Sequence, residues 1–569
     1  MNLHNKATPT AVTETTAKSD ASNQPPPFGD VNLFTSDAAL ADTVQREGGG
    51  RAAKGLTAFG QICGSAENAE LARLANENTP KLKTHSTRGD RLDVVEFHPA
   101  YHALMEINCA EGLHSSVWAH HATPDASPKA GAHVVRAAGC YTAAQMEAGH
   151  CCPITMTNAA VPTLLLQPDI AAEWLPKILP KAYDRRFVAF PDKTAVTIGM
   201  GMTERQGGTD VRANITRARP ASGKGGPGTE YILDGHKWFM SAPMSDGFLV
   251  LAQANKGLSC FLMPRFLPDG SINGLQFQRL KDKLGNRSNA SSEVEFHGAH
   301  AWLIGEEGRG VLSIIEMVTY TRLDCAVSSA GLMRSAVARA IHHAEHRSVF
   351  GTALVKQPLM AEVLADLALD VEAATALAFR LARSFDRATD QRAAAWRRLM
   401  TPVTKYWVCK IAPAVVAEAM ECLGGNGYVE DHTLARLYRE VPVNAIWEGS
   451  GNVMALDVLR VLQRDGEVVE TVMEELKQAA GDDAHLKAAH ARLESILQEP
   501  RLLDVRGRTL VEGLAVLAAG TILRAHAPAA VADAFIATRM GSIPRFTYGQ
   551  GLDWADKSAI IARATPNRA

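Results

Sequence analysis

Residues 197–306 carry a run of short β-type segments between two long helical regions, and this arrangement constrains the fold more than any other feature of the chain. Clusters of Gly, Pro, Asn and Asp separate the segments, which cover residues 196–200, 230–233, 237–240, 248–252, 259–263, 275–280 and 293–296. Several short strands at this spacing are typical of a small sandwich or barrel. We therefore expect an all-β domain inserted into a mostly helical protein.

Helical periodicity dominates on both sides of this insertion. Residues 37–181 have a helical pattern, and long helices are expected over residues 311–346 and 392–423. Between the two long helices, apolar residues step by three and four along one face: Leu364, Leu367, Val371, Ala374, Leu377 and Leu381. Long antiparallel helices of this kind form bundles. The predicted class is α+β, mostly α, with an N-terminal helical domain (31–196), a middle β domain (197–306), a helical bundle (307–465) and an extra C-terminal helical domain (466–569).

Composition narrows the possible functions. The formal net charge of −2 argues against a globally basic nucleic-acid binder, although a local basic face is compatible with it. The nine cysteines are scattered without a C-x-x-C pair, which predicts reduced thiols, no metal site and a cytoplasmic protein. Residues 1–30 are polar and end near three prolines, so we expect a disordered tail. The longest apolar stretch, residues 510–523, predicts a buried helix and no membrane partner.

Glycine-rich segments carry the candidate chemistry. The segment Gly201-Met-Thr-Glu-Arg-Gln-Gly-Gly-Thr-Asp-Val211 follows a predicted strand, and its N–H groups and hydroxyls suit a planar heterocycle or a phosphate. A tight turn that needs glycine explains the same pattern. The segment Gly235-His-Lys-Trp-Phe-Met-Ser241 puts two aromatic residues and a hydroxyl on one strand, where a core role is the alternative. The chain has no dinucleotide-binding G-x-G-x-x-G, P-loop, H-E-x-x-H or G-x-S-x-G motif.

The order of these and three later segments resembles the acyl-CoA dehydrogenase superfamily over residues 70–465. M-T-E-x-x-G-G-[ST]-D, K-W-F-x-S and Lys283-Leu-Gly-Asn-Arg-Ser belong to the β region, and R-x-x-F-G, G-G-x-G-Y and E-G-[ST] follow in the helical region. Within the superfamily the chain is most similar to the AidB branch, which serves the alkylation response. The segments SDAALADTVQREGGG, EAGHCCPITMTNAA, LSCFLMPRFLPDG, RLKDKLGNRSNAS and VPVNAIWEGSGNVM carry this similarity, and it includes the extra C-terminal block that ordinary dehydrogenases lack.

The resemblance implies that FAD lies between the β domain and the helical bundle. The residues expected to contact it are Met202, Thr203, Thr209, Phe239, Met240, Ser241, Arg347, Phe350, Gly424, Gly425, Asn426, Gly427, Ile446, Trp447, Gly449, Ser450 and Asn452. In the superfamily, the segments that match Arg347, Phe350 and residues 424–427 reach the FAD of a neighbouring subunit, which implies a homotetramer. Gln357 lies ten residues after Arg347, whereas the superfamily glutamine lies eleven after its arginine, so Gln357 receives no cofactor role.

The resemblance also implies a catalytic base at Glu448. The reaction removes the proton α to a thioester carbonyl and moves a hydride from the β carbon to the flavin, which needs a positioned base in a dry site. The bulk of Trp447 is expected to desolvate this carboxyl and raise its pKa. Some relatives carry the base on the residue before the arginine that matches Arg322, but here that residue is Thr321. The expected acyl-CoA contacts are Thr203, Thr209, Ser241 and Arg322.

Two functions remain open. The first is a FAD-containing protein of the alkylation-damage response that binds duplex DNA and has weak or vestigial acyl-CoA dehydrogenase activity. The second is a working dehydrogenase for short or branched acyl-CoA with no DNA role. Residues 487–569 contain eleven Lys and Arg against seven Asp and Glu, a surplus that a merely solvated face also explains. Under the first function the residues expected to face DNA phosphates are Arg501, Arg506, Arg508, Arg524, Arg539 and Arg545.

Overall fold

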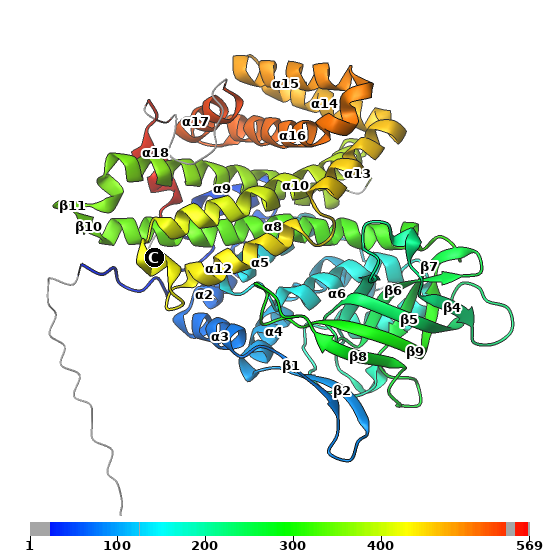
Figure 1. The fold of residues 1–569 in the computed structure, drawn as a ribbon. Coiled ribbons are helices and arrows are strands. Elements are labelled where there is room, and N and C mark those ends of the chain that lie inside the picture. The colour runs from blue at the N-terminus through cyan, green and yellow to red at the C-terminus, as the bar shows by residue number, and fades with distance from the viewer. Residues whose placement is uncertain (1–22, 124–125, 388, 542–551, 553, 567–569) are drawn as a thin grey trace, which may run out of the picture.

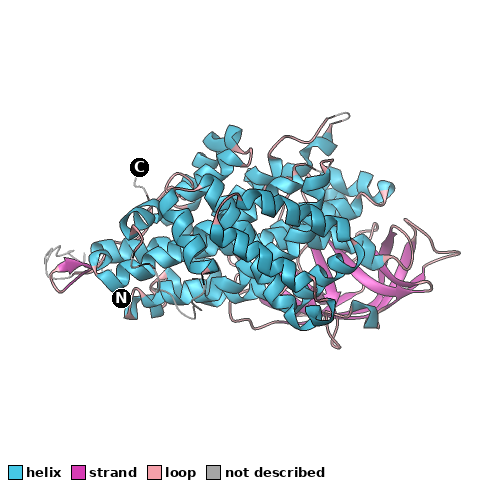
Figure 2. Cartoon of the chain, turned by 90° about the horizontal axis from the view of Figure 1, so that it is seen from above, coloured by secondary structure: helices cyan, strands magenta, loops and turns pink. Residues whose placement is uncertain are grey.

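Long helices and one compact β domain make up the protein. The computed structural model describes residues 23–123, 126–387, 389–541, 552 and 554–566. The helices stack in layers in Figure 1, and the view from above in Figure 2 shows most of the strands at one end of an elongated helical body and a short hairpin at the other end. The predicted class, mostly α with a β domain in the middle of the chain, is confirmed.

The N-terminal part consists of helices and one hairpin. The helices are α1 (Ala38–Arg46), α2 (Ala53–Cys63), α3 (Ala66–Glu77), α4 (Pro99–Glu111), α5 (Ala132–Met146), α6 (Cys151–Leu164) and α7 (Pro168–Ile178). Strands β1 (Lys81–His85) and β2 (Arg91–Glu96) pair antiparallel between α3 and α4, so the expectation of an entirely helical pattern is wrong there. The two strands are short and charged, and their period-two pattern is too brief to stand out from the helical sequence around it.

The middle domain is a closed sheet. Its strands are β3 (Ile198–Thr203), β4 (Arg217–Pro220), β5 (Glu230–Ser241), β6 (Gly247–Ala254), β7 (Gly257–Pro264), β8 (Leu275–Leu280) and β9 (Ser291–Ile304). The order β3-β5-β4-β6-β7-β9-β8 is closed by the additional pairings β3–β6 and β5–β9. The predicted small barrel is therefore present, with two expected segments merged into β5 and with β4 as an unexpected strand. Apolar side chains such as Phe248, Phe261 and Phe296 fill its interior.

Three long helices form the centre of the bundle. They are α8 (Gly310–His346), α9 (Pro358–Phe385) and α10 (Gln391–Glu421), which agree with the expected helices. The shorter elements are β10 (Ser348–Val349), β11 (Thr352–Ala353), α11 (Gly425–Tyr428), α12 (Thr433–Glu440) and α13 (Gly451–Arg464). Helix α8 is mostly buried because α5, α6, α9 and α10 all pack against it.

The C-terminal block covers the bundle and shares its core. It contains α14 (Gly466–Ala480), α15 (Ala484–Leu497), α16 (Leu503–His526), α17 (Ala529–Met540) and α18 (Lys557–Ala564). Its buried apolar residues belong to one cluster with those of α8, α9 and α10. By length and composition, the segment Pro500–His526 could cross a membrane, but 56% of its most apolar window is buried inside the protein. Residues such as Leu510 and Leu514 face the core, as expected for a buried helix.

The described part of the N-terminal tail lies against the bundle. Asn23 exchanges two hydrogen bonds with Ser348, at 2.7 and 2.9 Å, and its carbonyl accepts one from Arg347. The ring of Phe28 packs against the Arg339 guanidinium, 4.7 Å from the ring centroid. The prediction of disorder is therefore wrong for residues 23–30, while residues 1–22 lie outside the described residues. Sequence composition alone could not show contacts with residues more than three hundred positions away.

Candidate active site

Glu448 lies in a tight loop between residues 441–445 and the start of α13. Its backbone is left-handed, with φ of +57°, and Gly449 follows with φ of +103°. A residue other than glycine rarely adopts this backbone conformation, so contacts with neighbouring residues must stabilise it. Arg322 Nε donates to the Glu448 carbonyl at 3.0 Å, and Lys405 Nζ donates to the Trp447 carbonyl at 2.9 Å. The loop is thus fixed from α8 on one side and from α10 on the other.

The carboxyl of Glu448 is buried and hydrogen-bonded. Thr321 Oγ1 donates to Glu448 Oε2 at 2.6 Å. Burial raises the pKa of Glu448, while the Thr321 hydrogen bond and the positive charges of Arg322 and Lys405 oppose this rise. A raised pKa moves a carboxylate towards the range in which it accepts a proton efficiently. The expected direction of the shift, caused by desolvation, is confirmed.

Glu448 opens into a cavity of about 50 Å³ between α6, α8 and the loop that precedes α13. The lining residues are Ala148, Cys151, Cys152, Thr155, Met156, Ser241, Asn286, Thr321, Asp324, Cys325, Ser328, Glu440, Asn444, Trp447 and Glu448. The indole of Trp447, one of these lining residues, is held by a 2.8 Å hydrogen bond from Nε1 to Asn444 Oδ1. Three of the residues predicted for the site, Ser241, Trp447 and Glu448, therefore meet in one space.

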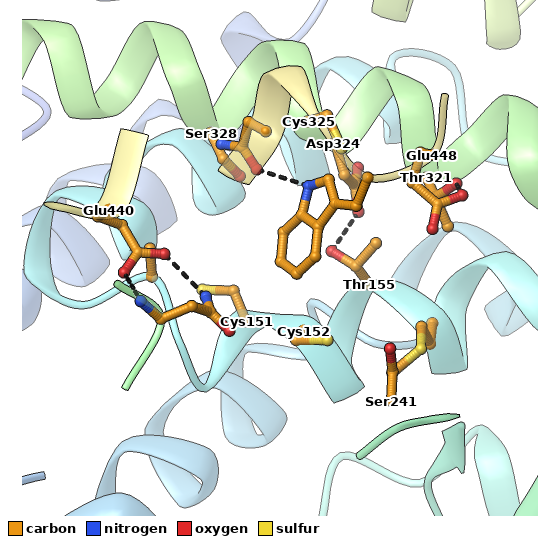
Figure 3. Close-up of a pocket in the computed structure, with 15 residues that line it drawn as sticks. Cys151, Cys152, Thr155, Ser241, Thr321, Asp324, Cys325, Ser328, Glu440 and Glu448 are labelled. Atoms are coloured by element: carbon orange, nitrogen blue, oxygen red, sulfur yellow. Dashed lines mark hydrogen bonds between the residues drawn. The ribbon is translucent and has the colours of Figure 1, made fainter. Parts of the chain in front are cut away.

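The α6 and α8 side of this cavity was not expected from the sequence. Thr155 Oγ1 donates to Asp324 Oδ2 at 2.8 Å (Figure 3). Both oxygens of Asp324 also pair with Arg136, at 2.7 Å. Burial raises the pKa of the Cys152 thiol to about 12, so this thiol is protonated at neutral pH. The adjacent cysteines Cys151 and Cys152 are visible in the sequence, but only the packing of α6 on α8 shows that they line a cavity.

Strands β3 and β5 present the residues expected to face the flavin ring. Thr203 pairs with Phe239, and Met200 pairs with Ser241. Phe239 is 47% exposed, with Lys281 Nζ 4.4 Å from its ring centroid, and its open position leaves it accessible to a flat ligand. Met240 is fully buried inside the barrel, so its side chain cannot contact FAD, and only its backbone is left for the predicted contact. The side chains of successive residues in a strand point to opposite faces of the sheet. Of the three predicted residues of β5, Phe239 and Ser241 therefore share the face that leads to the site.

A buried ion pair joins the two segments that carry these residues. Lys237 Nζ contacts Glu204 Oε1 at 2.7 Å, and both side chains are fully buried. Glu204 Oε2 also accepts a hydrogen bond from the Ile215 N–H at 2.7 Å. The loop after β3 is thus fixed to β5, which positions Thr203 and its neighbours. The motifs contain both residues, but their pairing was not predicted.

The remaining predicted cofactor contacts lie in two places. Ile446, at 67% exposure, and Ser450 are exposed beside Glu448, and Asn452 accepts a 2.8 Å hydrogen bond from Arg508 Nε. Arg347, Phe350 and residues 424–427 lie at the far end of α8, roughly 40 Å from Thr321 at 1.5 Å per helical residue. They cannot reach the same chain's cavity. Thr209 is exposed on the loop after β3, outside the lining of this cavity.

Two predicted residues have contacts that differ from their expected roles. Arg322 pairs with Asp457 at 2.7 Å and donates to the Glu448 carbonyl, so it holds the Glu448 loop in place. Its contact with the substrate stays a prediction. Gln357 Nε2 donates to the Val349 carbonyl at 3.0 Å, which fixes the turn after α8. This bond accounts for Gln357 without a cofactor role.

Of the six arginines expected to face DNA, the five that the structure describes differ in exposure and pairing. Arg501 and Arg508 are exposed, whereas Arg506 pairs with Glu499 and Arg524 pairs with Asp533, each at 3.2 Å. The side chain of Arg539 is only 6% exposed and pairs with Asp366 at 2.7 Å and Asp370 at 2.8 Å. Its prediction as a phosphate contact is wrong, because α17 packs this residue against α9. Arg545 lies outside the described residues.

Comparisons with known proteins agree with the sequence resemblance. Residues 23–185 match the family of the adaptive response protein AidB N-terminal domain, residues 199–299 the acyl-CoA dehydrogenase middle domain, and residues 308–463 the acyl-CoA dehydrogenase C-terminal domain. AidB of Escherichia coli is 48% identical over 515 residues, which cover 90% of this chain and 93% of that protein. The chain belongs to the AidB group of the acyl-CoA dehydrogenase family.

Other relatives extend this similarity to solved structures. Acyl-CoA dehydrogenase family member 11 of Caenorhabditis elegans is 32% identical, over 85% of this chain and 80% of its own length. The crystal structure of ACDH-11 of the same organism, in complex with C11-CoA, matches with a TM-score of 0.82 over 96% of both chains at 29% identity. As a member of this family the chain is a FAD-dependent enzyme of the acyl-CoA dehydrogenase type. The half-exposed Phe239 beside Ser241, at the edge of the cavity that holds Glu448, fits this cofactor.

Proposed function

We propose that the protein oxidises a short acyl thioester at its α,β bond, with Glu448 as the base. The shared cavity of Glu448 and Ser241 carries this proposal, because the base faces the strand that is expected to hold the flavin. Glu448 takes the α proton as the α,β bond becomes double, and FAD, when bound, supplies the acceptor for the hydride that leaves the β carbon. Thr321 orients the carboxyl, and Trp447 keeps water away from it.

The size of the cavity favours a short acyl chain. About 50 Å³ is a small space, and the Thr155–Asp324 hydrogen bond and the Trp447 ring form part of its wall. The relative from C. elegans was crystallised with the longer C11-CoA. Butyryl-CoA and isovaleryl-CoA are therefore expected to bleach the flavin faster than undecanoyl-CoA under anaerobic conditions.

Glu448→Gln tests the base directly. The substitution should abolish bleaching by every acyl-CoA while FAD content and the melting temperature stay close to those of the parent protein. Glu440→Gln is the comparison variant, because Glu440 is the other glutamate in the cavity and burial also raises its pKa. If Glu440→Gln stops the reaction and Glu448→Gln does not, the base has been assigned to the wrong carboxyl.

We further propose that the protein assembles as a homotetramer, in which Arg347, Phe350 and the turn at residues 424–427 complete the FAD site of a neighbour. Their distance from the same chain's cavity supports this, as does the exposure of the apolar side chains around them. Phe350 is 99% exposed, Leu359 82% and Tyr428 78%. A protein that is monomeric by light scattering and still carries one FAD per chain would contradict the proposal.

A second candidate function is duplex DNA binding within the alkylation-damage response in the cytoplasm, with weak dehydrogenase activity. The similarity to AidB over nearly its whole length supports it. Arg501 and Arg508 favour it as well, because neither has a carboxylate within ion-pair distance among the residues that the structure describes. An electrophoretic shift titration with duplex DNA at several salt concentrations tests this function, and no shift even at low salt excludes it.

A further inference from the structure

A second cavity, of about 260 Å³, lies between the β1–β2 hairpin, α4 and one end of the barrel. It shares no lining residue with the Glu448 cavity. Much of its wall is aromatic: Phe97, Tyr101, Tyr183, Phe187 and Phe266. The hairpin that forms one side is held to the barrel by a 3.0 Å hydrogen bond from Arg91 Nη2 to the Phe277 carbonyl. The space is therefore enclosed by fixed elements.

Arg265, the residue after β7, is a buried cation in this wall. It is 2% exposed, and its guanidinium lies 5.4 Å from the ring centroid of Phe187 and 4.8 Å from that of Phe277. Burial lowers the pKa of Arg265 to about 10, so the group is still charged at neutral pH. Its nearest partner is the Asp93 carbonyl, which accepts from Nη2 at 2.9 Å.

No carboxylate in the described parts of the chain forms an ion pair with Arg265, although the negative charge of Asp93 raises the pKa of Arg265 against the effect of burial. Its Nε–H has no hydrogen-bond partner, and no carboxylate lies within ion-pair distance of the guanidinium among those residues. The nearby Asp93 carboxylate pairs with Arg91 instead, at 2.7 Å. A buried charge normally has an ionic partner, because an uncompensated one costs several kcal/mol. Asp93, which Arg265 shares with Arg91, therefore compensates the charge of Arg265 only in part.

The other charged groups of the cavity leave a positive balance. Lys193 pairs with Asp246 and Arg186 pairs with Asp184, each at 2.6 Å. Arg185 is exposed at the rim without an ion pair in the described structure, and the exposed Glu96 is the remaining carboxylate of the lining.

One more titratable group faces the same space. His102 Nδ1 and Tyr183 Oη are 2.9 Å apart, and burial lowers the pKa of His102 to about 4, so His102 is neutral at neutral pH. The charges of the described lining that remain outside an ion pair are therefore the positive ones of Arg265 and Arg185 and the negative one of the exposed Glu96.

We propose that this cavity binds a small organic anion with a flat apolar body. The anionic group, a carboxylate or a phosphate, would neutralise Arg265, since a guanidinium forms strong charge-assisted hydrogen bonds with either group. The apolar body would lie against the aromatic rings of Tyr101, Phe187 and Phe266, where its burial contributes about 25 cal/mol for each Å² removed from water. Arg185 at the rim would attract the anion into the cavity.

Calorimetric titration of the full FAD-loaded protein with benzoate, phenyl phosphate and benzamide tests the proposal. Benzoate or phenyl phosphate should bind once per chain, and comparison of the two shows which anionic group the site prefers. Benzamide has the same ring without the charge and should bind at least tenfold more weakly. Binding of none of the three probes, or equal binding of benzoate, phenyl phosphate and benzamide, would overturn the proposal.

Two variants locate the site. Arg265→Met removes the charge from a similar volume and should weaken anion binding at least tenfold. Arg185→Ala should weaken it several-fold, and it decides the question if Arg265→Met fails to fold. Arg219→Ala, an exposed arginine of β4, is the matched control and should leave binding unchanged. If Arg265→Met folds and binds the anion as tightly as the parent protein, the anion occupies another site. If only Arg185→Ala folds, unchanged binding to that variant leads to the same conclusion.

Discussion

Thr321 Oγ1 donates a 2.6 Å hydrogen bond to Glu448 Oε2, across 127 positions of sequence. The next residue of the same helix, Arg322, donates to the Glu448 carbonyl. Two consecutive residues of α8 therefore hold the side chain and the backbone of the proposed base. Some relatives carry the base at the position of Thr321. In this chain that position is occupied by Thr321, and its hydroxyl orients the carboxylate of Glu448, the proposed base.

Thr321→Val should move the acidic limb of the pH–rate profile to higher pH. The Thr321 hydroxyl stabilises the charged form of Glu448 and so lowers its pKa, against the rise that burial causes. Without this donor the pKa rises further, and a smaller fraction of Glu448 is ionised at a given pH. Anaerobic flavin reduction by butyryl-CoA, followed over a range of pH, measures the shift. Thr319→Val should leave the profile unchanged, because this half-buried threonine of the same helix donates its hydroxyl to the Ile315 carbonyl at 2.9 Å and not to Glu448.

Arg322→Met should destabilise the protein by less than the ~3–5 kcal/mol that removing one partner of a buried ion pair usually costs, because Arg398 also pairs with Asp457, at 3.3 Å. The pair with Asp457 is 2.7 Å long, with side-chain exposures of 9% and 11%, so little solvent screening reduces the effect. Urea unfolding measures the loss. A double-mutant cycle with Asp457→Asn should give a positive coupling energy between the two residues, because Arg322→Met leaves a buried carboxylate that Asp457→Asn removes. If the two substitutions change the free energy of unfolding additively, Arg322 and Asp457 are not coupled.

The sequence predicted the elements whose patterns are long and local. The apolar steps from Leu364 to Leu381 indicated α9, and the alternating short segments indicated the barrel, because burial of one face sets the period of a helix or strand. The order of the motifs predicted that Glu448 and Ser241 belong to one site, and both line the same cavity. Each of these patterns and motifs is made of residues close together in the chain.

The errors concern contacts between distant segments. Composition made residues 23–30 look disordered, but Asn23 is hydrogen-bonded to Ser348. Motif membership assigned Met240 to FAD, although strand alternation turns it into the barrel. A charge count assigned Arg539 to DNA, although packing against α9 buries it between two aspartates. Charge and composition do not show which face of an element becomes buried, because that depends on partners elsewhere in the chain.

Asn23→Gly should weaken the retention of FAD and the stability of the tetramer. Asn23 has a left-handed φ of +43°, which glycine tolerates, so the substitution removes the side-chain bonds to Ser348 without straining the backbone. These bonds help to hold the turn that carries Arg347, a predicted contact with the neighbour's FAD. Release of FAD on dilution and light scattering measure the effect. If the rate of FAD release and the protein concentration at which half of the tetramer dissociates are both unchanged, residue 23 has no part in the assembly.

The last prediction separates a DNA surface from a structural arginine. If the C-terminal block binds duplex DNA, replacing Arg501, Arg506 and Arg508 together with Ala should weaken binding to unrelated sequences similarly. It should also flatten the slope of log affinity against log salt by about two to three, since each lost phosphate contact contributes about 0.9. Of the three arginines, Arg506 should contribute least to the change in slope, because Glu499 already pairs with it.

Substitution is a better test of this surface than truncation at residue 465, because the block shares its core with the bundle and removing it would expose buried apolar residues. Arg539→Ala is the contrasting variant. It should lower the melting temperature by leaving Asp366 and Asp370 buried without their partner, while the salt slope of DNA binding stays unchanged. FAD content should be measured in each protein, since Arg508 contacts Asn452. A triple variant with unaltered affinity and slope would show that these arginines form only a solvated face.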